Sequence, residues 1–381
     1  MLWARSADTQ SAMASITKMT TAIVALENAD LDTVCTVSEN AASVGESTAG
    51  LKAGMKVSLR DLLVCLLVHS GNDAAVAIAE NVGGDVDSFV AMMNDKVTDM
   101  GLKNTHYANP HGLDADGHYS SAADISVIAR YAMKNDTFRE IVNMRTATLT
   151  LGGEEVTFKN TNSLLTCWDD LIGCKTGYTN NAGECLASCA SRNGVELYAV
   201  VLGCDQDIDR FTDSYKLLNW GFAHYKAAKL ATSSDTLADV PMSGYVNRTV
   251  PAGVSDEVST RVLDYDGDIS VDVHFNDLPD GVHEGDTIGS VTWRQGEQVI
   301  VNTALVAKKT VRAPTGLESV WTHFRRLIGL ASGDPCVAKS ALYAQTVTVE
   351  RDKKDGSGSN VPSNLVDELN EDIIEVNQAT L

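Results

Sequence analysis

The chain has 381 residues, 44% of them hydrophobic, which is enough to bury the cores of two ordinary domains. Its 30 basic and 51 acidic side chains give a formal net charge of −21. That charge argues against nucleic-acid binding, because contact with phosphates needs a basic surface. No run of about 18 apolar residues occurs, so the sequence predicts no membrane-spanning helix.

The segment Ser-Ile-Thr-Lys from Ser15 to Lys18 lies at the start of a predicted helix. Residues three apart on a helix share a face, so Lys18 would lie one turn from the Ser15 hydroxyl. Burial disfavours the ammonium form of lysine, and a neutral Lys18 would then activate Ser15 as a nucleophile. Backbone N–H groups at the helix start would stabilise an oxyanion. The alternative, which the isolated motif favours, is a capping Ser15 beside a solvated Lys18. The helix is predicted from apolar residues at helical spacing: Ile16, Met19, Ile23 and Leu26.

A second motif, Ser70-Gly71-Asn72, lies between two predicted buried helices, over 59–68 and from residue 74 onward. Such a corner would point Ser70 and Asn72 into a cleft. Ser70 would pass a proton between Lys18 and a leaving amine, and Asn72 would hold Lys18 and the substrate amide. A simple capping turn is an equally good explanation of this motif alone.

The third motif, Lys175-Thr176-Gly177, lies on the first of three predicted strands of an antiparallel meander, followed by strands at 185–190 and 196–203. The Lys175 cation and the Thr176 hydroxyl suit a substrate carboxylate. Gly177 would let substrate backbone lie close to the strand. Arg210, just beyond the third strand, could add a second cation, although alone it would be taken for a surface arginine.

These three motifs, in this order, with His111-Gly-Leu-Asp114 between them, resemble the low-molecular-mass penicillin-binding proteins that are serine-type D-alanyl-D-alanine carboxypeptidases. The resemblance covers about residues 2–312. It implies removal of the terminal D-Ala from peptidoglycan stem peptides through an acyl-enzyme that β-lactam antibiotics also form. No cofactor is expected.

Carried over to this sequence, the resemblance assigns a role to each motif. Ser15 would be the acylated nucleophile and Lys18 its base. Ser70 and Asn72 would form the second catalytic element. The terminal carboxylate would bind Lys175, Thr176 and Arg210, beside Gly177, and the oxyanion hole would consist of the N–H groups of Ser15 and Tyr178.

The resemblance implies an α+β fold: a β-lactamase/transpeptidase-like catalytic domain, in which helices pack on an antiparallel sheet and a helical insert separates the first and third motifs, followed by a small all-β domain. Helical patterns over 31–145, a helix over 211–227 and alternating residues over 240–311 support it. The predicted divisions are a catalytic domain over 1–229, an all-β domain over 230–313, an amphipathic helix over 314–331 and an acidic, mostly disordered tail over 332–381 with at most one short helix.

The helix over 314–331 would carry one apolar stripe from Leu317 to Ile328, with basic residues beside it and Lys308, Lys309 and Arg312 before it. This pattern predicts peripheral contact with an anionic membrane. Packing of the stripe onto the all-β domain is the alternative, and the sequence favours neither.

The family acts at the outer face of the cytoplasmic membrane and carries a signal peptide, but Met1-Leu2-Trp3 shows no basic or apolar leader. The chain starts shortly before Ser15, so the family's first strand is expected to be missing. Eight cysteines are consistent with disulfides in an exported protein, yet most lie in apolar patterns, which favours free, buried thiols.

Three rival functions remain. A class A β-lactamase needs a water-activating glutamate in a Glu-x-x-Leu-Asn segment between the second and third motifs, and the sequence has none. A zinc D,D-peptidase would need metal ligands, but His111, Asp114 and His118 lie in a loop without a distant partner, so no metal is expected. A catalytically silent cell-wall-binding scaffold would not need the intact motifs.

Overall fold

The computed structural model describes residues 1–278, 281–332, 338–350 and 361–379. Two compact units divide the chain: unit 1 comprises Met1–Phe222 with Gly356–Leu381, and unit 2 comprises Ala223–Asp355. The boundary thus follows Phe222, where the sequence had placed it after residue 229. The C-terminal segment belongs to unit 1, which the sequence did not indicate.

The centre of unit 1 is an antiparallel sheet of three strands in the order β5-β6-β7. Lys175 pairs with Ala187 of β6, and Ala187 pairs with Val200 of β7. This is the predicted meander with the third motif on its first strand. The bounds are β5 Leu171–Thr179, β6 Gly183–Arg192 and β7 Val195–Cys204.

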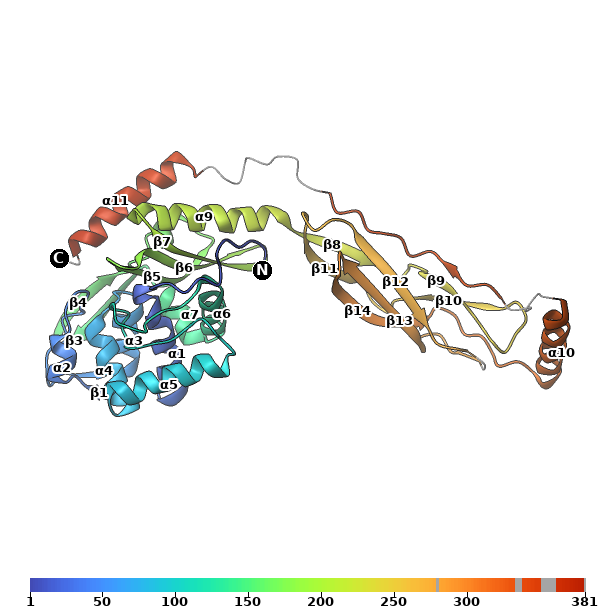
Figure 1. Ribbon diagram of the computed structural model, residues 1–381, viewed down its shortest axis with the longest axis horizontal. Helices are drawn as coiled ribbons and strands as arrows, with labels where there is room; N and C mark the ends of the chain where they lie inside the picture. The colour runs from blue at the N-terminus through green and yellow to red at the C-terminus, as the bar shows by residue number, and fades with distance from the viewer. Residues whose placement is uncertain (279–280, 333–337, 351–360, 380–381) are drawn as a thin grey trace. The chain divides into compact units, whose positions relative to one another are not determined.

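Both faces of this sheet are buried. Alternate residues of a strand point to opposite sides, so each face has its own set of buried side chains. On β6, Cys185, Ala187 and Cys189 join the core formed with the helical insert. Leu186 and Ala190 join a second core on the other face. In Figure 1, α1, α6 and α7 lie on one side of the sheet, and α9 and α11 lie on the other. The sheet is therefore the middle layer of unit 1.

The helical insert supplies the first side of this sandwich. Side chains of Ser58, Asp85, Ser121 and Asn135 accept hydrogen bonds from backbone N–H groups at the starts of α3, α5, α6 and α7, as N-capping residues do. The helices of this part are η1 Ala14–Thr17, α1 Lys18–Asn28, α2 Glu39–Ser43, α3 Leu59–Leu67, α4 Asn72–Gly83, α5 Val86–Asp99, α6 Ala122–Ala132 and α7 Asp136–Val142. Its strands are β1 Val34–Thr36, β2 Lys56–Ser58, β3 Thr146–Leu151 and β4 Glu154–Lys159.

The other face of the sheet is covered by α8 Leu164–Cys167, α9 Asp207–His224 and α11 Ser363–Ala379. The sequence analysis expected a mostly disordered tail with one short helix; within it, α11 forms a 17-residue helix. Leu365 and Leu369 are buried in the core of α8 and α9. The acidic character of the segment is what suggested disorder. Residues 333–337, 351–360 and 380–381 of the tail lie outside the described residues.

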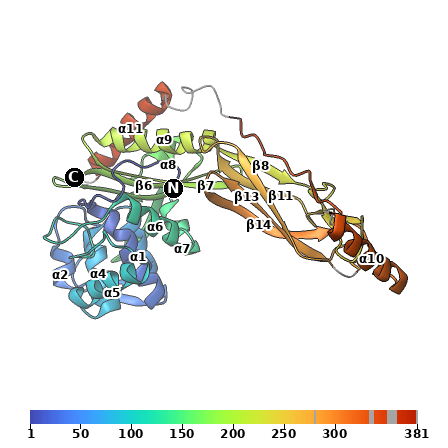
Figure 2. The same cartoon turned by 45° about the vertical axis from the view of Figure 1, so that its right-hand side comes forward.

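Unit 2 is built from a six-stranded sheet of order β12-β13-β14-β10-β9-β15 and the separate pair β8–β11. Trp293 is its largest fully buried side chain. Figure 2 shows α10, Gly316–Ser332, beyond one end of these strands. The strands are β8 Tyr225–Ala231, β9 Ala238–Pro241, β10 Thr249–Gly253, β11 Val258–Leu263, β12 Ile269–Phe275, β13 Thr287–Gln295, β14 Gln298–Ala307 and β15 Ala341–Leu342.

Seven of the eight cysteines lie within the described residues, and all seven are free thiols, five of them buried. Burial raises the pKa of the Cys174 thiol to about 12, so it stays protonated as a small apolar side chain. Cys336 lies outside the described residues. In the part of the chain that the structure describes, no helix is long and apolar enough to cross a membrane.

Candidate active site

Ser15 lies in the 3₁₀ turn η1, just before α1 begins at Lys18. The backbone of Ala14 has φ 50°, a left-handed conformation that is strained for alanine. The loop at Gly112 packs directly under this turn: a Cβ atom there would lie 2.1 Å from the Ala14 carbonyl oxygen. The nucleophile position is thus held by a close backbone contact that only glycine permits.

Lys18 connects the first two motifs. Its Nζ lies 2.6 Å from Ser15 Oγ, 3.3 Å from Ser70 Oγ and 2.7 Å from Asn72 Oδ1. The side chain is fully buried. The sequence predicted these partners from the motifs alone, and the structure brings all four residues together at one point.

Burial lowers the pKa of Lys18 well below its ordinary value, and the nearby Lys175 ammonium lowers it further. Asp73 and Glu46 act in the opposite direction, but their effects are smaller. A lysine with such a pKa is available in its neutral form, which can accept the hydroxyl proton of Ser15.

The second motif is held in a strained corner. Ser70 has φ 68°, an unusual conformation for a serine, which directs the residue out of the helical path between α3 and α4. The backbone N–H of Asn72 donates to the Ser47 carbonyl at 2.7 Å, and its Nδ2 donates to the Gly45 carbonyl at 3.0 Å. Asn72 therefore joins Lys18 to the loop at 45–47.

Asp73 fixes the same loop, a role that sequence reasoning missed. Its buried carboxylate accepts hydrogen bonds from the backbone N–H groups of Ala49 at 2.9 Å and Leu51 at 3.0 Å. Its partners lie more than twenty residues away, and no local pattern identifies them.

The third motif lies along the nucleophile on β5. A Cβ atom on Gly177 would lie 2.9 Å from both the Ser15 nitrogen and the Met13 carbonyl oxygen, so glycine is required for this approach. Tyr178 follows Gly177 directly on β5, and its side chain is exposed. This is the place where the sequence predicted an oxyanion hole.

Lys175 is fully buried, and its Nζ donates to the Thr176 carbonyl at 3.1 Å. Burial, aided by Arg210, lowers the pKa of Lys175 to about 7. The Thr176 Oγ1 lies 2.6 Å from Thr161 Oγ1. Of the two motif side chains proposed for a carboxylate, Thr176 lines the cleft, whereas Lys175 is buried near Lys18, which is equally buried.

Arg210 comes from the first turn of α9. Its guanidinium forms ion pairs with Asp207 and Glu184 and donates to the Gly177 carbonyl at 3.3 Å. Burial raises the pKa of Glu184 to about 7, against the opposing effect of Arg210. Neither acidic partner was predicted. Glu184 lies on β6, and Asp207 lies one turn before Arg210 on α9.

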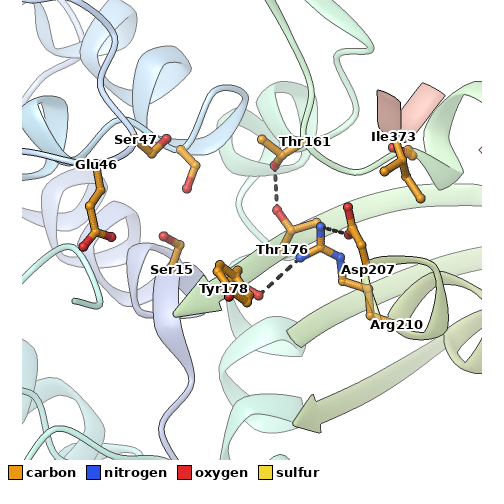
Figure 3. Close-up of a pocket in the computed structure, with 12 residues that line it drawn as sticks. Ser15, Glu46, Ser47, Thr161, Thr176, Tyr178, Asp207, Arg210 and Ile373 are labelled. Carbon is orange, nitrogen blue, oxygen red and sulfur yellow. Dashed lines mark hydrogen bonds and ion pairs between the residues drawn. The ribbon is translucent and has the colours of Figure 1, made fainter. Parts of the chain in front are cut away.

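These groups surround a cleft of about 270 Å³. In Figure 3, Ser15 and Glu46 lie at one end, and Arg210, Asp207 and Ile373 lie at the other. The lining residues are Ser15, Glu46, Ser47, Ser70, Thr161, Ser163, Thr176, Gly177, Tyr178, Asp207, Arg210 and Ile373. Sequence reasoning missed Glu46, Thr161 and Ile373, which reach the cleft only through the tertiary fold.

The histidines near the cleft have other roles. His118 Nε2 lies 2.8 Å from Thr17 Oγ1, and Asp114 accepts a hydrogen bond from Thr179 at 2.8 Å. Burial lowers the pKa of His111 to about 3, with a contribution from Lys18, so His111 is neutral. Among the described residues, no group of three or more His, Cys, Asp or Glu side chains could hold a metal ion.

A serine hydroxyl held 2.6 Å from a buried lysine with a lowered pKa, with an arginine at the far end of the cleft, is the arrangement expected of an acyl-transfer enzyme of the serine type. Comparison with known proteins gives the family. The sequence profile of the D-alanyl-D-alanine carboxypeptidases, a family of serine peptidases, matches residues 1–206, more than half of the chain. The chain belongs to this family.

Individual relatives agree. The chain is 28% identical to D-alanyl-D-alanine carboxypeptidase DacF of Bacillus subtilis, covering 82% of this chain and 82% of that protein. It is 33% identical to DacA of Haemophilus influenzae, over 68% of this chain and 71% of that protein. The match to Escherichia coli DacA, at 35% identity, spans 62% of this chain and 61% of that enzyme.

Solved structures show the same fold. The crystal structure of DacD from Francisella tularensis superimposes with a TM-score of 0.64 at 27% identity, covering 81% of this chain and 90% of that one. A Streptomyces DD-transpeptidase gives a TM-score of 0.56 at 36% identity, over 58% of this chain and 92% of that one. The predicted fold class is confirmed: a DD-peptidase-like unit with mixed helices and sheet, and a C-terminal all-β unit.

Proposed function

We propose that this carboxypeptidase removes the terminal D-alanine of peptidoglycan stem peptides through an ester on Ser15, and that β-lactams acylate the same hydroxyl. The family acts on D-Ala-D-Ala peptides and binds β-lactams. The observation that carries the assignment to Ser15 is the 2.6 Å contact between its Oγ and the buried Nζ of Lys18.

In the acylation step, neutral Lys18 accepts the Ser15 proton as Oγ attacks the carbonyl carbon of the penultimate D-alanine. The N–H groups of Ser15 and Tyr178 stabilise the oxyanion. The intermediate then collapses: the C–N bond breaks, and the leaving amine takes a proton from Lys18 through Ser70. Water hydrolyses the ester in the reverse sense and restores the Ser15 hydroxyl.

The terminal carboxylate is proposed to bind at the other end of the cleft. Thr176 offers its hydroxyl there, and Arg210 offers its guanidinium. Asp207 and Glu184 hold Arg210 in place and partly neutralise it, so the substrate carboxylate must share the guanidinium with them. Lys175 is proposed to add a second cation for this carboxylate and to act through its charge on Lys18.

Arg210→Ala tests the carboxylate site. We expect a drop of about tenfold to a hundredfold in kcat/KM for peptides ending in D-Ala-D-Ala, since the charged partner of the carboxylate is lost. The C-terminal amide of the same peptide should lose much less. Steady-state hydrolysis of the two peptides gives both values. Arg139→Ala, which removes an ion pair with Glu196 outside the cleft, is the matched control. Equal losses on both peptides would refute the role of Arg210.

We further propose that the enzyme works at the outer face of the cytoplasmic membrane and attaches through α10. Six apolar side chains of this helix are 50–87% exposed, whereas Thr322 on the opposite side is buried. This favours a surface that meets lipid over packing onto the β sheet. The basic residues contribute less to contact with an anionic membrane than expected. Lys308 donates to two backbone carbonyls, and Arg312 pairs with Glu318 at 2.7 Å. The exposed side chains are Leu317, Val320, Trp321, Phe324, Leu327 and Ile328.

The membrane proposal predicts binding to vesicles that depends on this apolar face. The full chain should co-sediment with anionic liposomes, and the double variant Trp321→Ser/Phe324→Ser should bind about tenfold or more weakly, because two aromatic anchors are removed. Tyr343→Ser, which removes an exposed aromatic outside α10, should bind as the unchanged chain does. If no form sediments at low salt, the anchoring role of α10 is wrong.

A further inference from the structure

Helix α11 brings the C-terminal part of the chain to the active site. Leu365 and Leu369 are 4% and 0% exposed and pack in one core with Leu164, Leu165 and Trp168 of the α8 region. Because α8 directly precedes β5, this packing places α11 beside the strand that carries the third motif.

One turn further along α11, an ion pair fixes the helix to the edge of the cleft. Asp372 Oδ1 lies 2.6 Å from Lys159 Nζ at the end of β4, and the Asp372 side chain is only 10% exposed. A short, largely buried pair of this kind holds its partners in a defined geometry. Residues 365, 369 and 373 are spaced four apart, so they share one face of the helix.

Ile373 is the residue of this face that reaches the cleft. In Figure 3 it lies beyond Thr161 and Asp207, on the side away from Ser15. Of the groups proposed for the terminal carboxylate, Thr176 lies between Ser15 and Ile373, and Arg210 lies at the same end of the cleft as Ile373. Ile373 is the one aliphatic side chain among the described residues that line the cleft, and it lies at the end where the released residue is proposed to bind.

We propose that α11 forms the far wall of the leaving-group side of the cleft, and that Ile373 limits the size of the C-terminal residue that the enzyme releases. The inference rests on the proposed function of the cleft. It makes Ile373 a specificity-determining residue. D-alanine, with its single methyl group, fits between this wall and the residues that bind the terminal carboxylate. A branched or longer D-residue does not fit there. The Asp372–Lys159 pair positions the wall.

The test compares two peptides that differ only in the released residue, diacetyl-L-Lys-D-Ala-D-Ala and diacetyl-L-Lys-D-Ala-D-Leu. Both retain the terminal carboxylate, so its contacts cancel in the ratio of their kcat/KM values. In full-length Ile373→Ala, the ratio of D-Leu to D-Ala peptide should rise about tenfold, because space for a few carbons has been opened. Ile373→Trp should lower the ratio below that of the unchanged chain.

Glu371→Ala is the matched control, since Glu371 is exposed and lies two residues from Ile373, on the opposite side of the same helix, and its ratio should equal that of the unchanged chain. Asp372→Asn keeps the shape but removes the charge, and it should raise the ratio in the same direction as Ile373→Ala. The rate of penicillin acylation is measured for every variant and reports on Ser15 and Lys18 separately from the wall.

An Ile373→Ala ratio equal to that of the unchanged chain, with penicillin acylation intact, would overturn the role of the wall and leave the proposed function standing. Failure of the unchanged chain to react with either penicillin or the D-Ala-D-Ala peptide would instead remove the proposed function. A rise with Ile373→Ala and a fall with Ile373→Trp, at constant acylation rate, would establish Ile373 as the limit on the released residue.

Discussion

Ser15→Ala should abolish the covalent penicillin adduct and reduce hydrolysis of D-Ala-D-Ala peptides by a factor on the order of 10⁶. The hydroxyl removed is the group that forms the ester, and the neighbouring lysine has no other hydroxyl at 2.6 Å to activate. Gel fluorescence after incubation with a fluorescent penicillin measures the adduct, and release of D-alanine measures the hydrolysis.

Ser126→Ala is the control for this experiment, because Ser126 lies on α6 and its hydroxyl donates only to the helix carbonyl of Ala123. It should label like the unchanged chain. Circular dichroism and thermal melting should show that Ser15→Ala is folded. A folded Ser15→Ala protein that still carries the adduct would show that the nucleophile is another residue.

Lys18→Ala should lose acylation by every substrate, by about 10²–10⁴-fold, because the base that accepts the Ser15 proton is gone. Penicillins and peptides should be affected alike, in contrast to Arg210→Ala. Stopped-flow acylation with a chromogenic β-lactam gives the rate. Lys52→Ala, an exposed lysine outside the cleft, should be neutral.

The direction in which acylation changes with pH follows from Lys18. Only neutral Lys18 accepts a proton, so the rate should fall as the pH is lowered through the pKa of Lys18. Burial and the Lys175 ammonium both lower that pKa. Lys175→Met should therefore raise the pKa of Lys18 and move the acid limb to higher pH. If the acid limb of the pH–rate profile stays at the same pH in Lys175→Met, Lys175 does not act on Lys18.

The sequence predicted which motif residues lie close together, because each motif is short and local. Ser15 and Lys18 are three residues apart, so one helical turn places them side by side. The alternation of side chains along β5 directs Thr176 toward the cleft. The order of the three motifs then implied that they meet. The fold class followed from the same resemblance and from the change to alternating apolar and polar residues after residue 230.

What the sequence did not predict depends on contacts between distant segments. The burial of Lys175 near Lys18, whose pKa it lowers, was not predicted, and contact of Lys175 with the substrate stays a prediction. Arg210 was expected to be available, but Glu184 and Asp207 reach it from two elements. Helix α11 is acidic, and its buried residues pack into the core of α8 and α9, a contact between distant segments that the sequence analysis did not indicate.

The most direct test of the acyl-enzyme is the intact mass of the protein after brief exposure to benzylpenicillin, followed by peptide mapping. The account predicts an increase equal to one whole penicillin molecule, since the β-lactam ring opens without a leaving group, and it predicts that the modified peptide carries the added mass on Ser15. An unchanged mass, or an adduct mapped to any other residue, would contradict it.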